Sequence, residues 1–232
     1  KNEVVALLNE REAAFLALRN FSYEPVQDYL QNSGLHGKDL SLARQIAAGS
    51  IKRLLTLKYF ARKLIKRLYL NRSEKLLLFS AIYQYVFMDK IPLYAIIDET
   101  MEIAKKYFGP KKAKFLYAAL QKLADLDLSV PGKKNAFDLS LRFSYPPYFI
   151  KLLIEEYGLK KTLVLLEVQN ATPLLMVRLF SPQKVAGLNR VYQNVYLITK
   201  HEKVATFAKS TNMYIQNVTP CYLMRKLAKG LN

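Results

Sequence analysis

Between residues 76 and 120 apolar runs alternate with helix-breaking residues, and this pattern constrains the fold more than any other feature. Ile91-Pro92 interrupts the first run, because proline lacks an amide donor and disfavours helix at the residue before it. Helix resumes with Asp98 and Glu99 in its early part, where the helix dipole favours negative charge. Gly109-Pro110 ends that helix and a lysine-rich segment opens the next. The pattern therefore predicts three consecutive helices.

Charge is the second constraint. The chain has 36 Lys and Arg against 18 Asp and Glu, a formal net charge of +18 over 232 residues. Such an excess repels itself unless a polyanion is a regular partner, and nucleic acid is the commonest polyanion in cells. An anionic membrane surface is the main alternative. With 51% hydrophobic residues the chain can also bury a real core, as one large or two ordinary domains.

The sequence excludes two classes of protein, those that span a membrane as a helix and those held together by internal disulfides. The longest apolar run, residues 76–88, contains Ser80 and Gln84 and is shorter than the roughly 20 residues that a membrane helix needs. No signal peptide is expected, because the acidic residue Glu3 falls at the start of the chain where a signal peptide is positively charged. The single cysteine, Cys221, cannot form an internal disulfide or a cysteine zinc site, so it is predicted to be a buried structural residue. A cytoplasmic protein is expected.

Helical spacing extends over the first half of the chain. Apolar residues recur at helical intervals in residues 2–21, 26–31 and 50–69, and Asp39 is placed to cap a further helix that ends near Ala48. Residues 1–128 are therefore predicted to form an all-helical bundle.

Composition changes after this bundle. Residues 129–140 carry proline, glycine and lysines and are predicted to be a linker, and residues 141–232 a small α+β domain. Within that domain the patterns predict helices at 149–156, 160–169 and 222–229, and strands at 174–180, 191–198 and 214–218. The expected fold class is thus mainly α, with a small α+β domain at the end.

The order of residues in the first domain resembles a known helical domain, that of the bacterial antitermination factor NusB. It resembles more closely the NusB-like domain that begins the Sun/Fmu (RsmB-type) ribosomal RNA cytosine-C5 methyltransferases. Families of this type usually carry Asn and Arg where this chain has Tyr117 and Gln121. The matching residues are Tyr83, Gln84, Asp89, Ile91, Pro92, Ala95, Asp98, Glu99, Glu102, Ala104, Lys105 and Leu120.

The second domain resembles the same methyltransferase family. Two segments depart from the family pattern: Leu179-Phe180 replaces Val-Asn after Arg178, and Gln216-Asn217 lacks the usual acidic residue. The resemblance runs in order from about residue 10 to residue 228. Its matching residues are Ser144, Pro146, Tyr148, Phe149, Tyr157, Gly158, Asn170, Pro173 and Arg178.

The resemblance implies a parent enzyme that uses S-adenosylmethionine, but this chain lacks that chemistry. The family's glycine-rich cofactor loop and its catalytic cysteines lie downstream of the matched region, and the glycines here show no G-x-G spacing. Pro220-Cys221 precedes the position of the family's catalytic Pro-Cys, so it is not expected to be the nucleophile. His36 and His201 have no companion metal ligands. No catalytic, cofactor or metal residues are predicted, and the chain alone is expected to be inactive.

A run of cations marks the predicted binding surface. Residues 40–73 contain nine basic residues and no acid. In a helix over 50–69 many of these cations would lie opposite the apolar face, at spacings suited to phosphates. The alternative is an ordinary solvated helix face. The residues predicted to contact RNA are Arg11, Arg44, Lys52, Arg53, Arg62, Lys63, Lys66, Arg67, Lys111, Lys112 and Lys114.

Three functions follow from these patterns. The first is the RNA-binding N-terminal region of a ribosomal RNA 5-methylcytosine methyltransferase, which grips small-subunit RNA for a catalytic domain in cis that this chain does not contain. The second is a stand-alone NusB-like adaptor in transcription antitermination. The third, a peripheral membrane protein, is disfavoured because the basic helix already has an apolar stripe suited to a bundle core.

Overall fold

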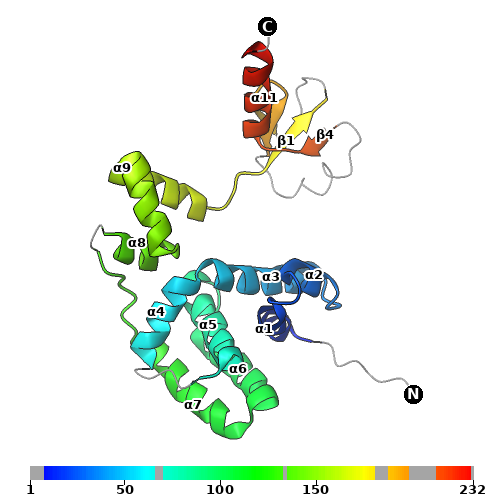
Figure 1. The fold of residues 1–232 in the computed structure, drawn as a ribbon. Helices are drawn as coiled ribbons and strands as arrows, with labels where there is room; N and C mark the ends of the chain where they lie inside the picture. Colours follow the sequence, from blue (N-terminus) through cyan, green and yellow to red (C-terminus); the bar gives the residue numbers. More distant parts are fainter. Residues whose placement is uncertain (1–7, 66–69, 133–134, 181–187, 199–212, 231–232) are drawn as a thin grey trace. The chain divides into compact units, whose positions relative to one another are not determined.

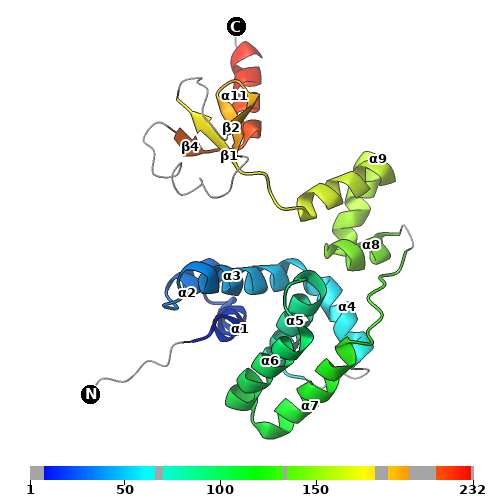
Figure 2. The ribbon, with the colours of Figure 1, turned by 180° about the vertical axis from the view of Figure 1, so that it is seen from behind.

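The computed structural model describes residues 8–65, 70–132, 135–180, 188–198 and 213–230. It divides into two compact units, Lys1–Glu167 and Val168–Asn232. The first is helical and the second carries a small antiparallel sheet, which confirms the predicted fold class. Figures 1 and 2 show the two units from opposite sides.

The first unit is a series of consecutive helices (Figure 1). Helices α1 to α7 share one hydrophobic core, and the buried residues of α8 and α9 form a second, smaller cluster. Small residues on the first helix, such as Ala13 and Ala17, are fully buried and let it pack closely on the third. Phe15 of the same helix and Phe60 fill the centre. The helices are α1 (Glu10–Asn20), α2 (Val26–Gln31), α3 (Gly37–Lys52), α4 (Leu54–Leu64), α5 (Arg72–Phe87), α6 (Leu93–Phe108), α7 (Pro110–Leu120), α8 (Ala136–Phe143) and α9 (Pro147–Asn170), with a 3₁₀ turn η1 (Gln121–Leu123) after α7.

The three helices predicted between residues 76 and 120 are confirmed as α5, α6 and α7. Pro92 is the N-cap of α6, so its missing amide costs no helical hydrogen bond. Gly109 has φ 80°, a conformation that favours glycine, and it joins α6 to α7 with Pro110 at the first helical position. Asn71 and Glu74 form a capping box at the start of α5.

The predicted basic helix over residues 50–69 is wrong in its bounds. The chain turns at Arg53 (φ −102°, ψ 16°), which separates α3 from α4, and α4 ends before Ile65, whose backbone is extended. Residues 66–69 lie outside the described part of the chain. Asp39 is also not the N-cap of α3, which is His36. Asp39 lies in the first turn of the helix, where the helix dipole stabilises its negative charge.

The predicted linker contains a helix. Asn135 accepts a hydrogen bond from the amide of Asp138 (2.8 Å) and caps α8, so helix begins inside residues 129–140. The Thr56 hydroxyl donates to the Leu141 carbonyl (2.7 Å), which holds α8 on α4. Helix α8 buries its apolar side and belongs to the first compact unit, which ends at Glu167. The division of the chain into domains at residues 129–140 stays a prediction.

Helix α9 is two helical arms joined at Gly158. That residue has φ 74° and ψ 160°, a non-helical conformation that L-residues with a side chain rarely adopt. The arms correspond to the two helices predicted at 149–156 and 160–169, and glycine was the predicted stop between them.

The second unit carries a four-stranded antiparallel sheet with strand order β2-β3-β1-β4. Figure 2 labels three of its strands and helix α11. The predicted strand over 191–198 is part of a hairpin, because Gln193 has φ 49° and reverses the chain between two strands. Cys221 is buried, as predicted. The elements are β1 (Met176–Leu179), β2 (Leu188–Tyr192), β3 (Val195–Ile198), β4 (Met213–Ile215) and α11 (Val218–Gly230).

Candidate nucleic-acid interface

The residues predicted to contact RNA divide into exposed cations and cations that hold the fold. Arg62, Lys111 and Lys114 are exposed and form no ion pair with a carboxylate among the described residues. Lys52 is exposed at the end of α3 and has an intramolecular contact. Lys66 and Arg67 fall outside the described residues.

Lys63 ties α4 to the segment after η1. Its ammonium group donates to the Asp127 carboxylate (3.0 Å), the Asp127 carbonyl (2.8 Å) and the Ser129 carbonyl (3.0 Å). Partial burial opposes the charge, but the hydrogen bonds with Asp127 and Tyr59 outweigh it and raise the pKa of Lys63. Hydrogen bonds from Ser129 and Lys63 lower the pKa of Asp127. Lys63 therefore stabilises the fold by holding residues 127–129 against α4.

Arg53 occupies the turn between α3 and α4. Its guanidinium lies 5.1 Å from the centre of the Phe87 ring, a cation–π contact that holds the turn on α5. Burial lowers the pKa of Arg53, while the neighbouring Tyr83 and Tyr145 act in the opposite direction. The half-buried position limits its access to a phosphate.

Arg11 and Arg44 are also half-buried. The Arg11 guanidinium donates to Gln84 (2.9 Å) on α5 and to Glu10 (2.8 Å) on its own helix, and its side chain is only 13% exposed. Gln84 belongs to the residues that carry the family resemblance, and this contact gives it a packing role. Nε of Arg44 is buried without a hydrogen-bond partner among the described residues.

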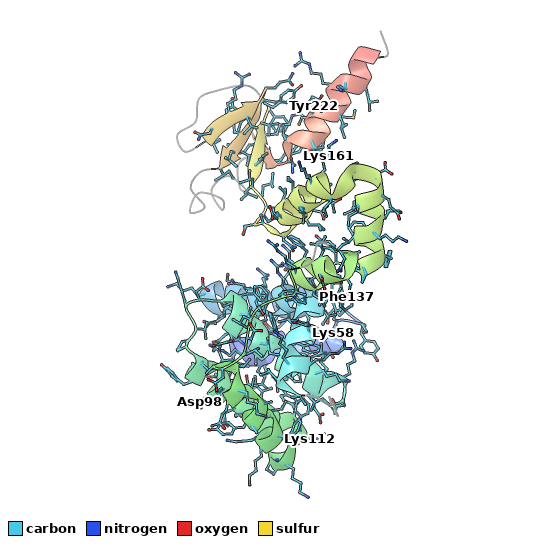
Figure 3. The ribbon with its side chains drawn as sticks, turned by 90° about the vertical axis from the view of Figure 1, so that its left-hand side faces the viewer. Lys58, Asp98, Lys112, Phe137, Lys161 and Tyr222 are labelled. Carbon is cyan, nitrogen blue, oxygen red and sulfur yellow. The ribbon has the colours of Figure 1, made fainter. Side chains whose placement is uncertain are left out.

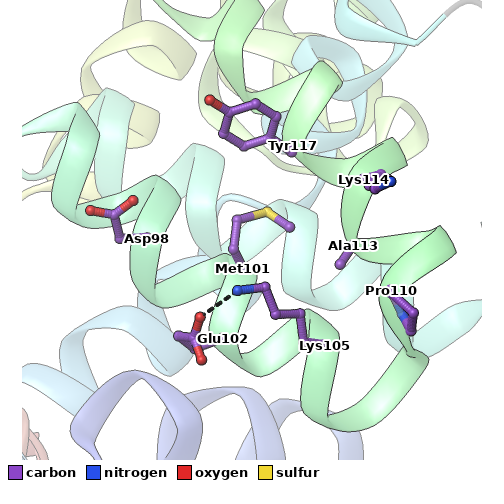
Figure 4. Close-up of a pocket in the computed structure, with 8 residues that line it drawn as sticks. All are labelled: Asp98, Met101, Glu102, Lys105, Pro110, Ala113, Lys114 and Tyr117. Atoms are coloured by element: carbon purple, nitrogen blue, oxygen red, sulfur yellow. Dashed lines mark hydrogen bonds and ion pairs between the residues drawn. The ribbon is translucent and has the colours of Figure 1, made fainter.

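The elbow before α7 presents two exposed lysines and one paired lysine. Lys112 forms an ion pair with Glu74 (3.2 Å), whose side chain is 4% exposed. Lys114 lines a groove of about 430 Å³ between α6 and α7 (Figure 4). Asp98 and Glu102 line the same groove, and Lys105 pairs with Glu102 (2.7 Å). Carboxylates therefore offset the cations in this groove.

A second pocket of the helical unit gathers three cations and no acid, and none of the three is among the residues predicted to contact RNA. Lys58 of α4 and Arg72 and Lys75 of α5 line a cavity of about 450 Å³. Its other lining residues are mostly apolar: Leu18, Phe21, Ser50, Ile51, Leu54, Leu76 and Phe79. Lys58 and Arg72 belong to residues 40–73, which contain no acidic residue. That run is the sequence feature from which these two cations could have been predicted as RNA contacts. Their meeting depends on how α4 packs on α5, which no local pattern gives.

We refer to Lys58, Arg62, Arg72 and Lys75 as the basic patch. Lys58 and Arg62 are both exposed and lie one turn apart, on one side of α4 (Figure 3 labels Lys58). Arg72 donates to the Ser22 hydroxyl (2.5 Å), and no carboxylate pairs with any patch residue among the described residues. Because no carboxylate neutralises these cations, the patch has a positive electrostatic potential that attracts anions from solution.

Other site types find no support in the described part of the chain. Its acidic, histidine and cysteine side chains form no group of three that could hold a metal ion. Among the same residues no helix combines the length and hydropathy required to cross a membrane.

Within the helical unit, the chain is similar in sequence to known proteins. The model of the NusB family matches residues 7–125. The transcription antitermination protein NusB of Heliobacterium modesticaldum is 33% identical over 106 residues, which cover 44% of this chain and 52% of that protein. The chain thus spans about half the length of this curated relative.

A solved structure shares the fold further along the chain. The structure titled "Crystal Structure of PH0851" superposes with a TM-score of 0.61 at 13% identity, over 89% of this chain and 52% of that one. At this identity the likeness concerns the fold alone. It extends beyond the residues that the family model matches.

Proposed function

Because the chain belongs to the NusB family, we propose that its helical unit binds structured ribosomal RNA of the small subunit. In this proposal the chain is the RNA-gripping region of a ribosomal RNA cytosine-C5 methyltransferase, and a catalytic domain in cis that uses S-adenosylmethionine modifies the bound RNA. In this proposal the basic patch makes the phosphate contacts and the rest of the bundle is scaffold.

The observation that carries RNA binding is the basic patch itself. Three exposed cations and the half-buried Lys75, from two helices, have no paired carboxylate among the described residues. Unpaired surface cations repel one another, so the arrangement lowers stability unless an anion binds there. Phosphates of RNA supply anions at a regular spacing and release condensed counterions when they bind.

Two observations bear on the choice between an enzyme region and an adaptor. In favour of the enzyme region, the fold likeness to the PH0851 structure covers 89% of this chain but only 52% of that chain, so the same arrangement occurs inside a longer protein. In favour of the adaptor, the similar Heliobacterium protein is named a transcription antitermination protein. We favour the enzyme region, because the chain continues in an ordered sheet beyond the NusB match at residue 125.

The test of RNA binding is affinity for a small-subunit ribosomal RNA fragment at several salt concentrations. The variant carries Lys58→Glu and Arg62→Glu. The matched control carries Lys90→Glu in the turn after α5 and Lys151→Glu on α9, two exposed lysines outside the patch. Each lost phosphate contact flattens the slope of log affinity against log salt by about 0.7 to 0.9. We expect the patch variant to lose affinity and slope far more than the control. Equal losses in both variants would contradict the proposed surface.

A transcription assay separates the enzyme region from the adaptor. If the chain binds ribosomal RNA but leaves terminator read-through by RNA polymerase unchanged, the enzyme region is supported. An increase in read-through on adding the purified chain, abolished in the patch variant, would favour the adaptor.

A further inference from the structure

The pocket behind the basic patch is amphipathic. Its walls combine the apolar side chains of Leu54, Leu76 and Phe79 with the cations of Lys58, Arg72 and Lys75. Phe79 is 4% exposed and belongs to the core, whereas Phe21 at the end of α1 is 49% exposed and offers a free ring surface. Exposed aromatic rings next to cations are typical of surfaces on which nucleic-acid bases stack.

The size of the cavity limits its occupant. A volume of about 450 Å³ lies within the range of pockets that hold one small molecule or one group of a larger ligand. An amphipathic protein helix would instead need a row of apolar sites along several turns. The charge on the rim requires an anionic ligand, and the apolar lining requires that the same ligand carry a flat or apolar group.

We infer that this pocket receives one unpaired nucleotide of the bound RNA. The base lies against the Phe21 ring and the apolar lining, and the flanking phosphates lie at Lys58, Arg72 and Lys75. A base enters such a pocket only when it is not paired, so the site selects loops, bulges or single strands over continuous duplex. This inference rests on the proposed function, because it specifies which part of the RNA the helical unit holds.

The closing experiment compares a short unstructured RNA strand with the same sequence as a duplex. Affinity is measured for the intact chain, for Phe21→Ala, for Phe21→Tyr, and for the double variant Arg72→Gln with Lys75→Gln. Tyr94→Ala and Lys90→Gln are the matched controls, because Tyr94 is 71% exposed and both residues lie away from the pocket lining.

We expect the single strand to bind more tightly than the duplex. Loss of one stacked base costs about 1–3 kcal/mol, so Phe21→Ala should weaken single-strand binding about 5- to 150-fold and duplex binding little. Phe21→Tyr should restore single-strand affinity, since it keeps the aromatic face. The Arg72 and Lys75 double variant should flatten the salt slope by about 1.4 for the single strand.

The outcomes separate this inference from the proposed function. RNA binding with no strand preference, or with Phe21→Ala equal to Tyr94→Ala, overturns the nucleotide pocket and leaves RNA binding standing. No binding to any RNA overturns both. An acidic amphipathic peptide that binds through Phe21 while single-stranded RNA does not would assign the pocket to a protein partner and overturn the inference. If Phe21→Ala proves unstable by circular dichroism, the salt slope of the Arg72 and Lys75 variant decides.

Discussion

Gly49 lies directly against the ring of Tyr83. A Cβ atom on Gly49 would stand 2.0 Å from Cζ and 2.1 Å from Oη of Tyr83, far closer than real side-chain contacts. Tyr83 is 9% exposed and its ring stacks on Phe87 at 5.4 Å, so it has little room to move aside. The absence of a side chain at Gly49 therefore sets how closely α3 approaches α5.

The first prediction concerns this contact. Gly49→Ala should lower the free energy of unfolding by about 1–3 kcal/mol, because overpacking forces the ring or the helices apart. Chemical denaturation measures the change. Gly132→Ala is the control, since a Cβ at Gly132 meets no atom within 4 Å. Adding Tyr83→Leu to Gly49→Ala should remove part of the loss; strictly additive effects would contradict direct contact.

The second prediction concerns alkaline pH. The Tyr107 hydroxyl donates to the buried Glu12 carboxylate (2.6 Å), and burial together with this bond raises the pKa of Tyr107 to about 12. A tyrosine in the unfolded chain titrates near pH 10. The contribution of Tyr107 to the free energy of unfolding is thus complete below about pH 10 and is lost as pH rises toward about 12.

Absorbance of tyrosinate checks this titration. The chain should show a tyrosine that titrates at about pH 12 and is absent in Tyr107→Phe, whereas the raised titrations of Tyr29 and Tyr83 should remain. The stability difference between the two proteins should shrink between pH 10 and about 12. Tyr94→Phe serves as the control, because Tyr94 is exposed. A titration curve that Tyr107→Phe leaves unchanged would be inconsistent with the Glu12 contact.

The third prediction concerns the kink of α9. Gly158→Ala should destabilise the packing of α8 against α9 by about 1–3 kcal/mol, because φ 74° with ψ 160° is a region open almost only to glycine. Gly132→Ala again serves as the reference. Hydrogen exchange at the amides of residues 136–143 reports the loss locally. Protection equal to that of the reference would show that the backbone relaxes without cost.

The fourth prediction concerns catalysis. The purified chain should neither bind S-adenosylmethionine nor transfer a methyl group to RNA, because its glycines lack the spacing that brings backbone close to a nucleoside. Isothermal titration calorimetry and transfer of labelled methyl groups measure the two activities, with a full-length methyltransferase of the Sun/Fmu family as positive control. A transfer signal from the chain alone would refute the proposed division of labour.

Local chemistry explains which elements the sequence predicts well. The bounds of α6 and α7 follow from Pro92, Gly109 and Pro110, whose backbone restrictions act whatever the tertiary context. The turn at Arg53 has no such residue. It arises because Leu57 and Phe60 point into the core while Thr56 bonds to α8, and these are long-range contacts that periodicity does not report.

The candidate site shows the same division. Charge counting indicates a polyanionic partner, but it does not separate free cations from those in internal contacts. Arg11 is held by Gln84 across 73 residues, and Lys63 by Asp127 across 64 residues. The pocket that joins Lys58 to Arg72 likewise needs the packing of α4 on α5. A sequence pattern therefore predicts the sign of the surface charge but not where on the surface the free cations lie.

The capping box at Asn71 and Glu74 also bears on the order of folding. Its two side chains lie three residues apart, so they can meet on the microsecond timescale on which an isolated helix forms. The ion pair between Glu74 and Lys112 spans 38 residues and must await the docking of α7. In stopped-flow kinetics we therefore expect Asn71→Ala to slow refolding and Lys112→Met mainly to speed unfolding. These two results together would mean that the Glu74 carboxylate gains its first partner before the transition state and its second after it, so that the start of α5 forms ahead of α7.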